Sequence, residues 1–474
     1  MMNTKLEECL PAGQAGNNGT MERWEKKFNI PMFQYATIPR PQEGTASFQH
    51  SRSPDTFCRD EDPDECRGAT PPLSVSVVIP VHNGAFTIAQ TIESCLAQDY
   101  SGPLEIIVVD DGSTDNMAEI VKKYSDYVAS DFMSDNISEV PPGGTQAGVV
   151  ACLDIVNAFQ KGETTVESRP KRGPAAARNT GWRAARGDII VFTDADCLPP
   201  PDWVSRLISG FNIPIFQHSS FPTGVPIGAV GGGYQIANSD NLLAVCIQAE
   251  MAYRYNRMPA NTKFLSTHNL AIRRDVLKQI NGFDESYPDA SAEDNDLIYR
   301  MQKAGYGLLL QKENQMPHHH ATNIRKYLRK QFQHAFWRVK LYSRHPGMAK
   351  GDDYTGLKDV LEPFLALFIL SFLVCFPLFI TYNSSFITNL TCDSLLATGC
   401  FLIIWQLFWA VKVVYKNSMG EDKLNRYKIC NRALFLALVG FLRSFARGLG
   451  MAAGIFIHLF VKLKTFGFAK GVFF

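Results

Sequence analysis

Two aspartates, Asp194 and Asp196, stand one residue apart where an apolar run ends. The run is IIVF, beginning at Ile189, and it is followed directly by TDADC. In an extended segment residues i and i+2 point the same way, so both carboxylates can converge on one target. Two hard oxygen donors that leave room for water and a diphosphate suit Mg²⁺ or Mn²⁺. A polar transition from strand to loop, with one aspartate capping the next helix, would explain the same residues.

A second pair of acids ends another apolar run. Asp110 and Asp111 follow LEIIVV, and two neighbouring carboxylates repel each other unless something binds them. Ser113 and Thr114, just downstream, are typical of turns and helix N-caps. Capping explains the hydroxyl residues but leaves the two carboxylates as binding candidates.

A third acidic group, Glu293 and Asp294, begins the segment EDNDLIYRMQK, whose apolar spacing predicts a helix. Acidic residues at a helix N-terminus are stabilised by the macrodipole, so position alone would explain the pair. The catalytic alternative is that one carboxylate of this group is a general base that takes a proton from an incoming hydroxyl group. The residues by themselves leave both interpretations open.

Imidazole and basic side chains accompany these acids. His318 is the first of three consecutive histidines, and one of the three is a candidate to complete a metal shell or contact a diphosphate. Arg178, in the segment RGPAAARN, is a candidate for contact with a nucleotide, although solvated arginines on helix faces are common. Four more candidates end the first apolar run: Pro80, Val81, His82 and Asn83.

The elements that must position these residues alternate in type. Continuous β-branched runs such as 73–81 and 104–109 are typical of strands buried on both faces, and a segment with helical spacing follows each. Alternating strands and helices predict βαβ units, a mostly parallel sheet and an α/β fold. Such sheets bind ligands beyond the carboxyl ends of their strands, where Asn83, Asp111 and Asp196 fall.

Two stretches lack this alternation of strands and helices. Residues 1–72 are rich in Pro, Gly, Ser and acids, and we predict a poorly ordered leader without a cleaved secretory signal. Residues 126–165 are interpreted as an insertion on the surface of the fold, containing a short helical stretch at 149–160. The globular domain is therefore expected to span 73–345.

The chain becomes membrane-like in its last part, 346–474. Three apolar stretches are long enough, or nearly so, to cross a bilayer: 364–381, 395–411 and 433–461. Arg443 and Arg447 lie near the middle of the third, which is costly for a lipid-exposed helix. An interfacial segment, a re-entrant hairpin or two short pieces are therefore expected there, giving two to three helical segments in all.

Basic residues set the expected topology. The connection 382–394 contains no Lys or Arg, whereas 412–432 and 325–344 are rich in them. By the positive-inside rule the globular domain and the 412–432 loop face the cytoplasm. A buried hairpin of a soluble protein over 364–411 is the alternative.

Composition excludes other classes. The net charge of +1 is too small to favour binding to the phosphates of a nucleic acid. The 11 cysteines are odd in number and lack paired C-x-x-C spacing, which fits a reducing compartment and provides no zinc site. The first strand is not followed by G-x-G-x-x-G, which argues against a Rossmann dehydrogenase.

Five segments in this order make the pattern specific: VVIPVHNGAFTI, IIVVDDGSTD, AAARNTGWRAARGDIIVFTDADC, HNLAIRRDVLKQINGFDE and AEDNDLIYRMQKAGY. The set, over about 73–345, resembles a family 2 glycosyltransferase with the GT-A fold. The resemblance implies inverting transfer from a nucleoside-diphosphate sugar, with a UDP-sugar favoured, in the presence of Mg²⁺ or Mn²⁺. The implied acceptor is a hydroxyl or phosphate group, lipid-linked or on a growing glycan.

The resemblance also implies a role for each motif residue. The donor would be bound by Pro80, Val81, His82, Asn83, Asp111, Arg178 and Asp194. The metal would be held mainly by Asp196, with Asp194 and His318. Asp294 would be the general base, and the acceptor or diphosphate would be contacted by Glu293, Gln333 and Trp337.

One departure bears on the type of transfer. Gln333 to Trp337 reads QHAFW where processive polysaccharide synthases show Q-x-x-R-W, so Phe336 stands at the arginine position and Arg338 lies just beyond. A processive synthase is therefore the runner-up. An inactive GT-A membrane scaffold and a glycoside hydrolase with paired carboxylates are weaker alternatives.

Overall fold

A computed structural model describes most of the chain beyond the expected leader. The described residues are 72–124, 147–154, 171–212, 224–382, 385–417 and 426–470. All of them belong to one compact unit, Thr70–Phe474. The predicted disorder of 1–71 lies outside the described residues, and so does most of the 126–165 segment.

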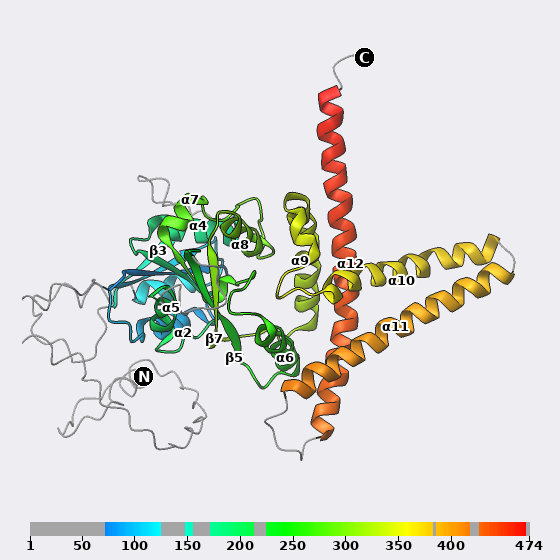
Figure 1. The fold of residues 1–474 in the computed structure, drawn as a ribbon, viewed down its shortest axis with the longest axis horizontal. Helices are drawn as coiled ribbons and strands as arrows, with labels where there is room; N and C mark the ends of the chain where they lie inside the picture. Colours follow the sequence, from blue (N-terminus) through cyan, green and yellow to red (C-terminus); the bar gives the residue numbers. More distant parts are fainter. Residues whose placement is uncertain are drawn as a thin grey trace, which may run out of the picture. The chain divides into compact units, whose positions relative to one another are not determined.

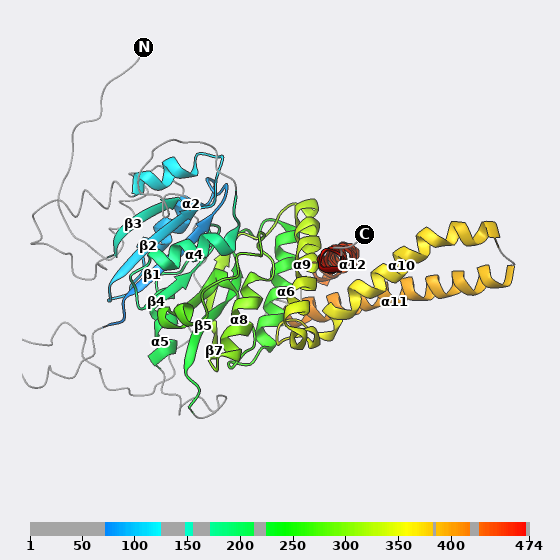
Figure 2. The ribbon, with the colours of Figure 1, turned by 90° about the horizontal axis from the view of Figure 1, so that it is seen from above.

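A seven-stranded mixed sheet, in the order β3-β2-β1-β4-β6-β5-β7, forms the centre of the globular part (Figures 1 and 2). The strands are β1 Val75–Val81, β2 Leu104–Asp110, β3 Ala147–Asp154, β4 Ile189–Phe192, β5 Ile227–Ile236, β6 Leu270–Arg273 and β7 Gly307–His318. β1 is parallel to both β2 and β4, and β5 is parallel to β7. Only β6 runs against its neighbours β4 and β5. The predicted mostly parallel α/β fold is confirmed.

The apolar strands are buried because helices cover both faces of the sheet. Successive side chains of a strand point to opposite faces, so Val77 of β1 joins one core and Val78 joins the other. The first core includes α2 (Ile88–Leu96) and α5 (Trp203–Asn212). The second includes α4 (Pro174–Ala184), α7 (Arg274–Gln279) and α8 (Glu293–Lys303). The two layers fix the carboxyl ends of β1, β2 and β4 at one edge.

The prediction of a helix at 149–160 is wrong where the structure describes that segment. Residues Ala147–Asp154 form the edge strand β3, which pairs in parallel with β2. A short apolar run such as VVACL fits a buried strand as well as a helix, and pairing with β2 decides between them. At least this part of the expected insertion belongs to the sheet.

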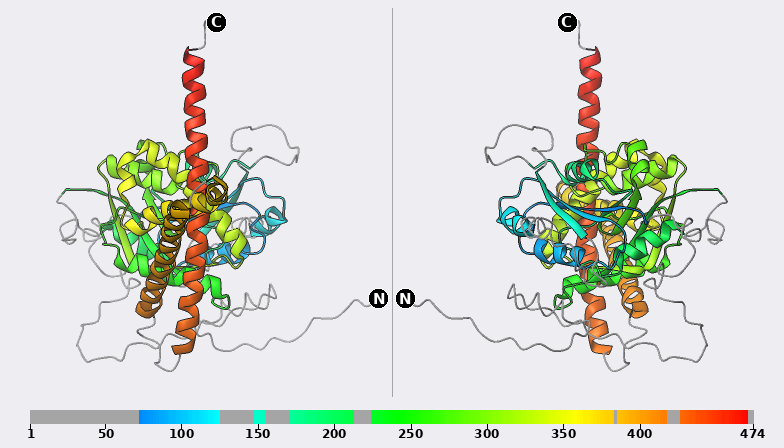
Figure 3. Two further views of the ribbon diagram at one scale, coloured as in Figure 1. Left: turned by 90° about the vertical axis from the view of Figure 1, so that its right-hand side faces the viewer. Right: turned by 90° about the vertical axis from the view of Figure 1, so that its left-hand side faces the viewer.

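Three long helices follow the globular part: α10 (Leu357–Tyr382), α11 (Ser385–Asn417) and α12 (Arg426–Lys470). Each expected apolar stretch lies inside one of them. The expectation of a broken third segment is wrong, because α12 is one continuous helix of 45 residues (Figure 3). By length and composition, Ala397–Lys416 and Asn431–Val461 are two candidate membrane spans among the described residues.

Two helices join this region to the sheet: α6 (Leu242–Arg257) and α9 (Ile324–Arg344). Cys246 and Tyr253 of α6 pack in one apolar cluster with residues of α11 and α12. α12 approaches α9 closely through two glycines spaced four apart. A Cβ on Gly450 would lie 2.2 Å from the carbonyl oxygen of Phe332, and one on Gly454 would lie 2.7 Å from that of Phe336. Small residues at this spacing allow such close helix contact.

Candidate active site

The loops after β1 and β2 are locked to each other by hydrogen bonds. Asn83 adopts a positive φ of 55°, which Asn tolerates better than most residues. Its side-chain oxygen accepts the Thr114 N–H at 2.7 Å, and its own N–H donates to the Ser113 hydroxyl at 2.9 Å. The two hydroxyl residues thus serve the loop structure, as their types predict. Pro80 and Val81 are buried within β1, so of this segment only His82 and Asn83 reach the surface of the site.

Asp111 anchors the start of α4. Its carboxylate accepts the Arg172 N–H at 2.7 Å and the Gly173 N–H at 2.9 and 3.1 Å. Gly173 has a φ of 97°, and a Cβ there would lie 2.2 Å from the Pro288 carbonyl oxygen, so this turn requires glycine. Burial raises the pKa of Asp111, although the two N–H groups oppose the rise. Its implied contact with the nucleotide base stays a prediction, and the structure shows what else it holds.

Arg178 bridges two of the acidic groups. From α4 its guanidinium donates to Asp194 Oδ1, after β4, and to Glu293 Oε1, at the start of α8, each at 2.9 Å. The Arg178 and Glu293 side chains are each only 4% exposed, whereas Asp194 is 34% exposed. Buried charges are tolerated when they are paired and hydrogen-bonded. The bridge therefore fixes the end of β4 against the α8 terminus that carries Asp294.

Glu293 is not satisfied by this bridge alone. Its Oε2 atom is buried and has no hydrogen-bond partner among the described residues. Burial and the neighbouring Asp294 raise its pKa, and Arg178 opposes the rise. A buried carboxyl with a raised pKa and a free oxygen, at a cluster of polar groups, is typical of functional sites.

Asp196 faces His318 rather than Asp194. Its Oδ1 lies 3.3 Å from His318 Nε2, at the end of β7. Burial opposes ionisation of Asp196, but His318, Lys330 and a backbone hydrogen bond together outweigh it and lower the pKa of the carboxyl. Donor atoms of Asp196, Cys197 and His318 all lie within 4.8 Å of one another, the one such group among the described residues. Asp194 and Asp196, close in sequence, thus have different partners.

The three histidines have different environments. His318 faces Asp196, whereas His320 makes a 2.8 Å hydrogen bond with Gln248 of α6. Burial and His318 lower the pKa of His320 to about 3, so it is neutral at ordinary pH. The backbone N–H of His319 donates to the Asp196 carbonyl oxygen at 3.0 Å and holds the two segments together. Of the three, His318 is the one placed to bind a metal.

Asp294 lies in the first turn of α8, half-buried. One oxygen accepts the N–H and the side-chain amide of Asn295, at 2.8 and 2.9 Å. Burial raises its pKa, while Asn295, Arg178 and Arg338 oppose the rise. Ala292, the residue just before α8, has a φ of 76°, which is a strained backbone conformation for a residue other than glycine. A carboxyl of raised pKa with one oxygen outside these bonds can accept a proton.

The segment Gln333–Trp337 of α9 gives only some of the contacts that the family resemblance implies. Trp337 Nε1 donates to Asp289 Oδ2 at 3.3 Å, so this ring supports the loop before α8. Gln333 is half-buried on the same helix. Phe336 packs edge-on against Trp337, with ring centroids 5.1 Å apart, and no arginine takes its place. Arg338 turns instead toward Thr355.

One aromatic group beside the site could not be found by motif. Tyr234 of β5 stacks on His268 at a centroid distance of 3.4 Å and meets His318 edge-on at 5.5 Å. His268 is fully buried, and burial keeps its pKa well below the usual value. The only signal was the polar segment THN between apolar residues, which pattern alone does not connect to His318.

The model of the family described as "Glycosyl transferase family 2" matches residues 76–137 and 150–280. The probable glycosyltransferase YdaM of Bacillus subtilis is 24% identical over 82% of this chain and 83% of its own length. Glycosyltransferase AglE of Haloferax volcanii is 26% identical over 54% of this chain and 70% of its own.

Among solved structures, a mannosyltransferase from Pyrobaculum calidifontis, in complex with GDP-Man and Mn²⁺, is similar at 20% identity and a TM-score of 0.44. The likeness covers 79% of this chain and 89% of that one. The matched family segments include the ends of β1, β2 and β4 together with Arg178 and Asp196. Residues 76–137 and 150–280 therefore match glycosyltransferase family 2, and the mostly parallel α/β sheet that carries them agrees with the GT-A fold expected from the sequence.

Proposed function

We propose that the protein transfers a sugar, with inversion, from a nucleoside-diphosphate sugar to a hydroxyl or phosphate acceptor at the cytoplasmic face of a membrane. The observation that carries this proposal is the Arg178 bridge. It ties Asp194, two residues from Asp196, to Glu293, which is next to Asp294. A metal-binding carboxylate and a proton-accepting carboxylate are thereby held on either side of one buried guanidinium.

The residues around Asp196 fit a divalent cation. A carboxylate and an imidazole lie 3.3 Å apart, and the Asp196 side chain is 43% exposed, which leaves coordination positions for water and diphosphate oxygens. Cys197 is a poor third ligand, because burial raises the pKa of its thiol well above the usual value and keeps it neutral. We assign Asp196 and His318 as the ligands. A bound Mg²⁺ or Mn²⁺ would neutralise the charge that develops on the leaving diphosphate.

Asp194 has a different role in this proposal. Because its carboxylate is paired with Arg178, it is positioned to contact the donor, for example the ribose, and to orient the loop that carries Asp196. His82 and Asn83, after β1, line the same edge of the sheet and complete the donor side. UDP is the favoured nucleotide.

Asp294 supplies the base. An acceptor hydroxyl attacks the anomeric carbon, its proton passes to Asp294, and the bond from that carbon to the diphosphate breaks, with the electron pair leaving on the nucleotide. One direct displacement inverts the anomeric centre. A phosphate acceptor is already deprotonated, so its transfer would depend less on Asp294.

The C-terminal helices favour the proposal that the acceptor is associated with a membrane. Two of them are candidate membrane spans, and both pack against α6 or α9 beside the catalytic domain. A lipid-linked sugar, polyprenyl phosphate or growing glycan at the bilayer surface would be within reach. Processive synthesis has less support, because Phe336 replaces the arginine of the Q-x-x-R-W pattern.

The test is release of nucleoside diphosphate by the detergent-purified full chain. UDP-, GDP- and dTDP-sugars are each supplied with Mn²⁺, with and without a chelator. We expect one donor to be turned over in a metal-dependent way, and Asp196→Asn and Asp294→Asn to abolish turnover. Asp202→Asn is the matched control, because Asp202, just before α5, forms a surface ion pair with Arg206 of that helix. Turnover that persists in chelator would remove the metal from the proposal.

A further inference from the structure

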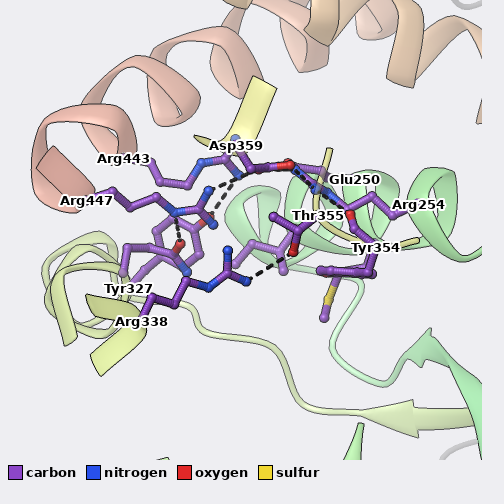
Figure 4. A pocket seen from close by; sticks show the side chains of 12 residues that line it. Glu250, Arg254, Tyr327, Arg338, Tyr354, Thr355, Asp359, Arg443 and Arg447 are labelled. Atoms are coloured by element: carbon purple, nitrogen blue, oxygen red, sulfur yellow. Dashed lines mark hydrogen bonds and ion pairs between the residues drawn. The ribbon is translucent and has the colours of Figure 1, made fainter. Parts of the chain in front are cut away.

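A second cluster of charged side chains lies where α6, α9, α10 and α12 meet (Figure 4). It surrounds a cavity of about 100 Å³. Four arginines and two carboxylates line this cavity: Arg254, Arg338, Arg443, Arg447, Glu250 and Asp359. One water needs about 15 Å³ of such space, so the cavity has room for several waters or for one tetrahedral oxyanion.

The two carboxylates are already fully engaged. Glu250 accepts from Arg443 at 2.5 Å and from Arg254 at 2.7 Å. Asp359 accepts from Arg254 at 2.6 and 2.8 Å and from Arg447 at 3.1 Å. Burial works against their ionisation, but these guanidinium groups outweigh it and hold the pKa of both carboxyls below their usual values. Four cations therefore face two anions, an excess of two positive charges.

Arg338 carries the charge that is least compensated. Its Nη2 atom donates to the Thr355 hydroxyl at 3.2 Å, and no carboxylate of the described chain lies within ion-pair distance of it. The nearby Asp352 accepts the backbone N–H groups of Tyr354 and Thr355 instead. Even with Asp352 counted, positive charge remains in excess. Arg338 is half-buried. A partly desolvated cation without a counterion is costly, and a bound anion would reduce that cost.

The cavity lies beside the proposed active site. Arg338 is close enough to Asp294 to oppose the rise in its pKa. A chain of ring contacts leads from the cavity wall to the metal ligand: Tyr354 to Tyr255 at 5.6 Å, Tyr255 to Tyr234 at 5.6 Å, and Tyr234 to His318 at 5.5 Å. Figure 4 shows the Arg338 and Arg447 side chains reaching the same space from α9 and α12. An anion held there would be anchored near both catalytic groups.

We propose that this arginine-lined cavity binds a phosphate group of the acceptor, so that the acceptor is a phosphorylated molecule anchored between α9, α10 and α12. The inference rests on the proposed function and narrows its acceptor class. Guanidinium groups suit this ligand because they bind phosphate oxygens in a planar, bidentate manner. The phosphate belongs either to a lipid headgroup or to a soluble phosphorylated acceptor.

Substitution of Arg338 is the most direct test of phosphate binding, because it leaves no carboxylate without an ion-pair partner. Full-length protein in phosphate-free detergent is titrated calorimetrically with inorganic phosphate, decyl phosphate and decanol. We expect decyl phosphate to bind and decanol not to, with Arg338→Gln weakening phosphate binding at least tenfold and Arg338→Lys retaining most of it. Arg329→Gln, an exposed arginine on the same helix, is the matched control and should bind as the wild type does.

Comparing the affinities of inorganic phosphate and decyl phosphate also distinguishes a soluble acceptor from a lipid acceptor. Decyl phosphate binding at least tenfold tighter than inorganic phosphate supports a lipid acceptor, and equal affinities support a soluble one. Binding of neither phosphate, or equal binding by Arg338→Gln and wild type, would overturn the proposal. Donor turnover is measured on the same preparations. Intact turnover without phosphate binding defeats only this inference, whereas phosphate binding without any donor turnover defeats the proposed function.

Discussion

Two arginine-centred clusters in this molecule have opposite charge balance. At the strand ends one guanidinium, Arg178, faces two carboxylates, Asp194 and Glu293, and Asp294 lies next to the latter. Between the helices four arginines face Glu250 and Asp359. The first cluster has carboxylates in excess and lies next to the proposed metal ligand Asp196, whereas the second has arginines in excess and suits an anion. Two sites of complementary sign beside one another are what a transfer between a metal-bound diphosphate and an anionic acceptor requires.

The largest expected effect is on turnover. Asp294→Asn removes the proton acceptor and should lower kcat by about 10²–10⁴-fold for a hydroxyl acceptor, with donor binding nearly unchanged. Steady-state kinetics and nucleotide binding on the same sample check this. If donor binding is lost as well, the role of Asp294 is structural.

Breaking the first cluster should cost more stability than breaking the second. Arg178→Gln leaves Glu293 buried without its counterion, and we expect a loss of about 3–5 kcal/mol in the free energy of unfolding. Arg338→Gln leaves no ion pair broken and should cost much less. Thermal unfolding of both variants beside wild type measures the difference, and Arg183→Gln, a half-exposed arginine on α4, serves as the surface control. Equal losses at Arg178 and Arg338 would contradict the charge balance assigned to the two clusters.

The second cluster also depends on how closely α12 approaches α9. Gly450→Ala places a Cβ against the Phe332 carbonyl oxygen, and the overpacking should destabilise the protein by about 1–3 kcal/mol. Gly399→Ala on α11 is the matched control: nothing lies within 4 Å of its Cβ, so this substitution should be neutral or slightly stabilising. If Gly450→Ala is tolerated, the backbones of α9 and α12 are further apart than a Cβ contact of 2.2 Å requires.

The smallest effect is on pH dependence. Asp294 must be ionised to accept a proton, and burial raises its pKa above the ordinary value of 3.8. The acid limb of kcat/KM for a hydroxyl acceptor should therefore lie above the usual aspartate pKa, with activity falling as the pH drops through it. Arg338→Gln removes a cation that opposes the rise and should move the limb to higher pH, while Arg329→Gln should leave it in place. An acid limb at or below the usual aspartate pKa would exclude Asp294 as the base.

Strand position was the most predictable feature of the sequence. β1, β2 and β4 are apolar runs that end in polar or acidic residues, so the edge where Asn83, Asp111 and Asp196 gather follows from pattern alone. β3 was missed because a short apolar run has no decisive period. Its assignment depends on pairing with β2, which is a tertiary contact.

Charge partners were much less predictable. Arg178 and Glu293 are 115 residues apart, and Arg443 and Glu250 are 193 apart. Without these partners the arginines of α12 indicated a break in an apolar helix, whereas the structure pairs them with carboxylates of α6 and α10. Motif spacing also suggested that Asp194 and Asp196 act on one metal, and only the fold shows that Arg178 engages the first.

Mn²⁺ binding, followed by electron paramagnetic resonance in the presence of nucleoside diphosphate, tests the central claim most directly. Asp196 faces His318 and Asp194 faces Arg178, so Asp196→Asn should lose Mn²⁺ binding while Asp194→Asn retains most of it. Wild-type binding by Asp196→Asn, or equal loss in the two variants, would contradict the assignment of the metal to Asp196 and His318.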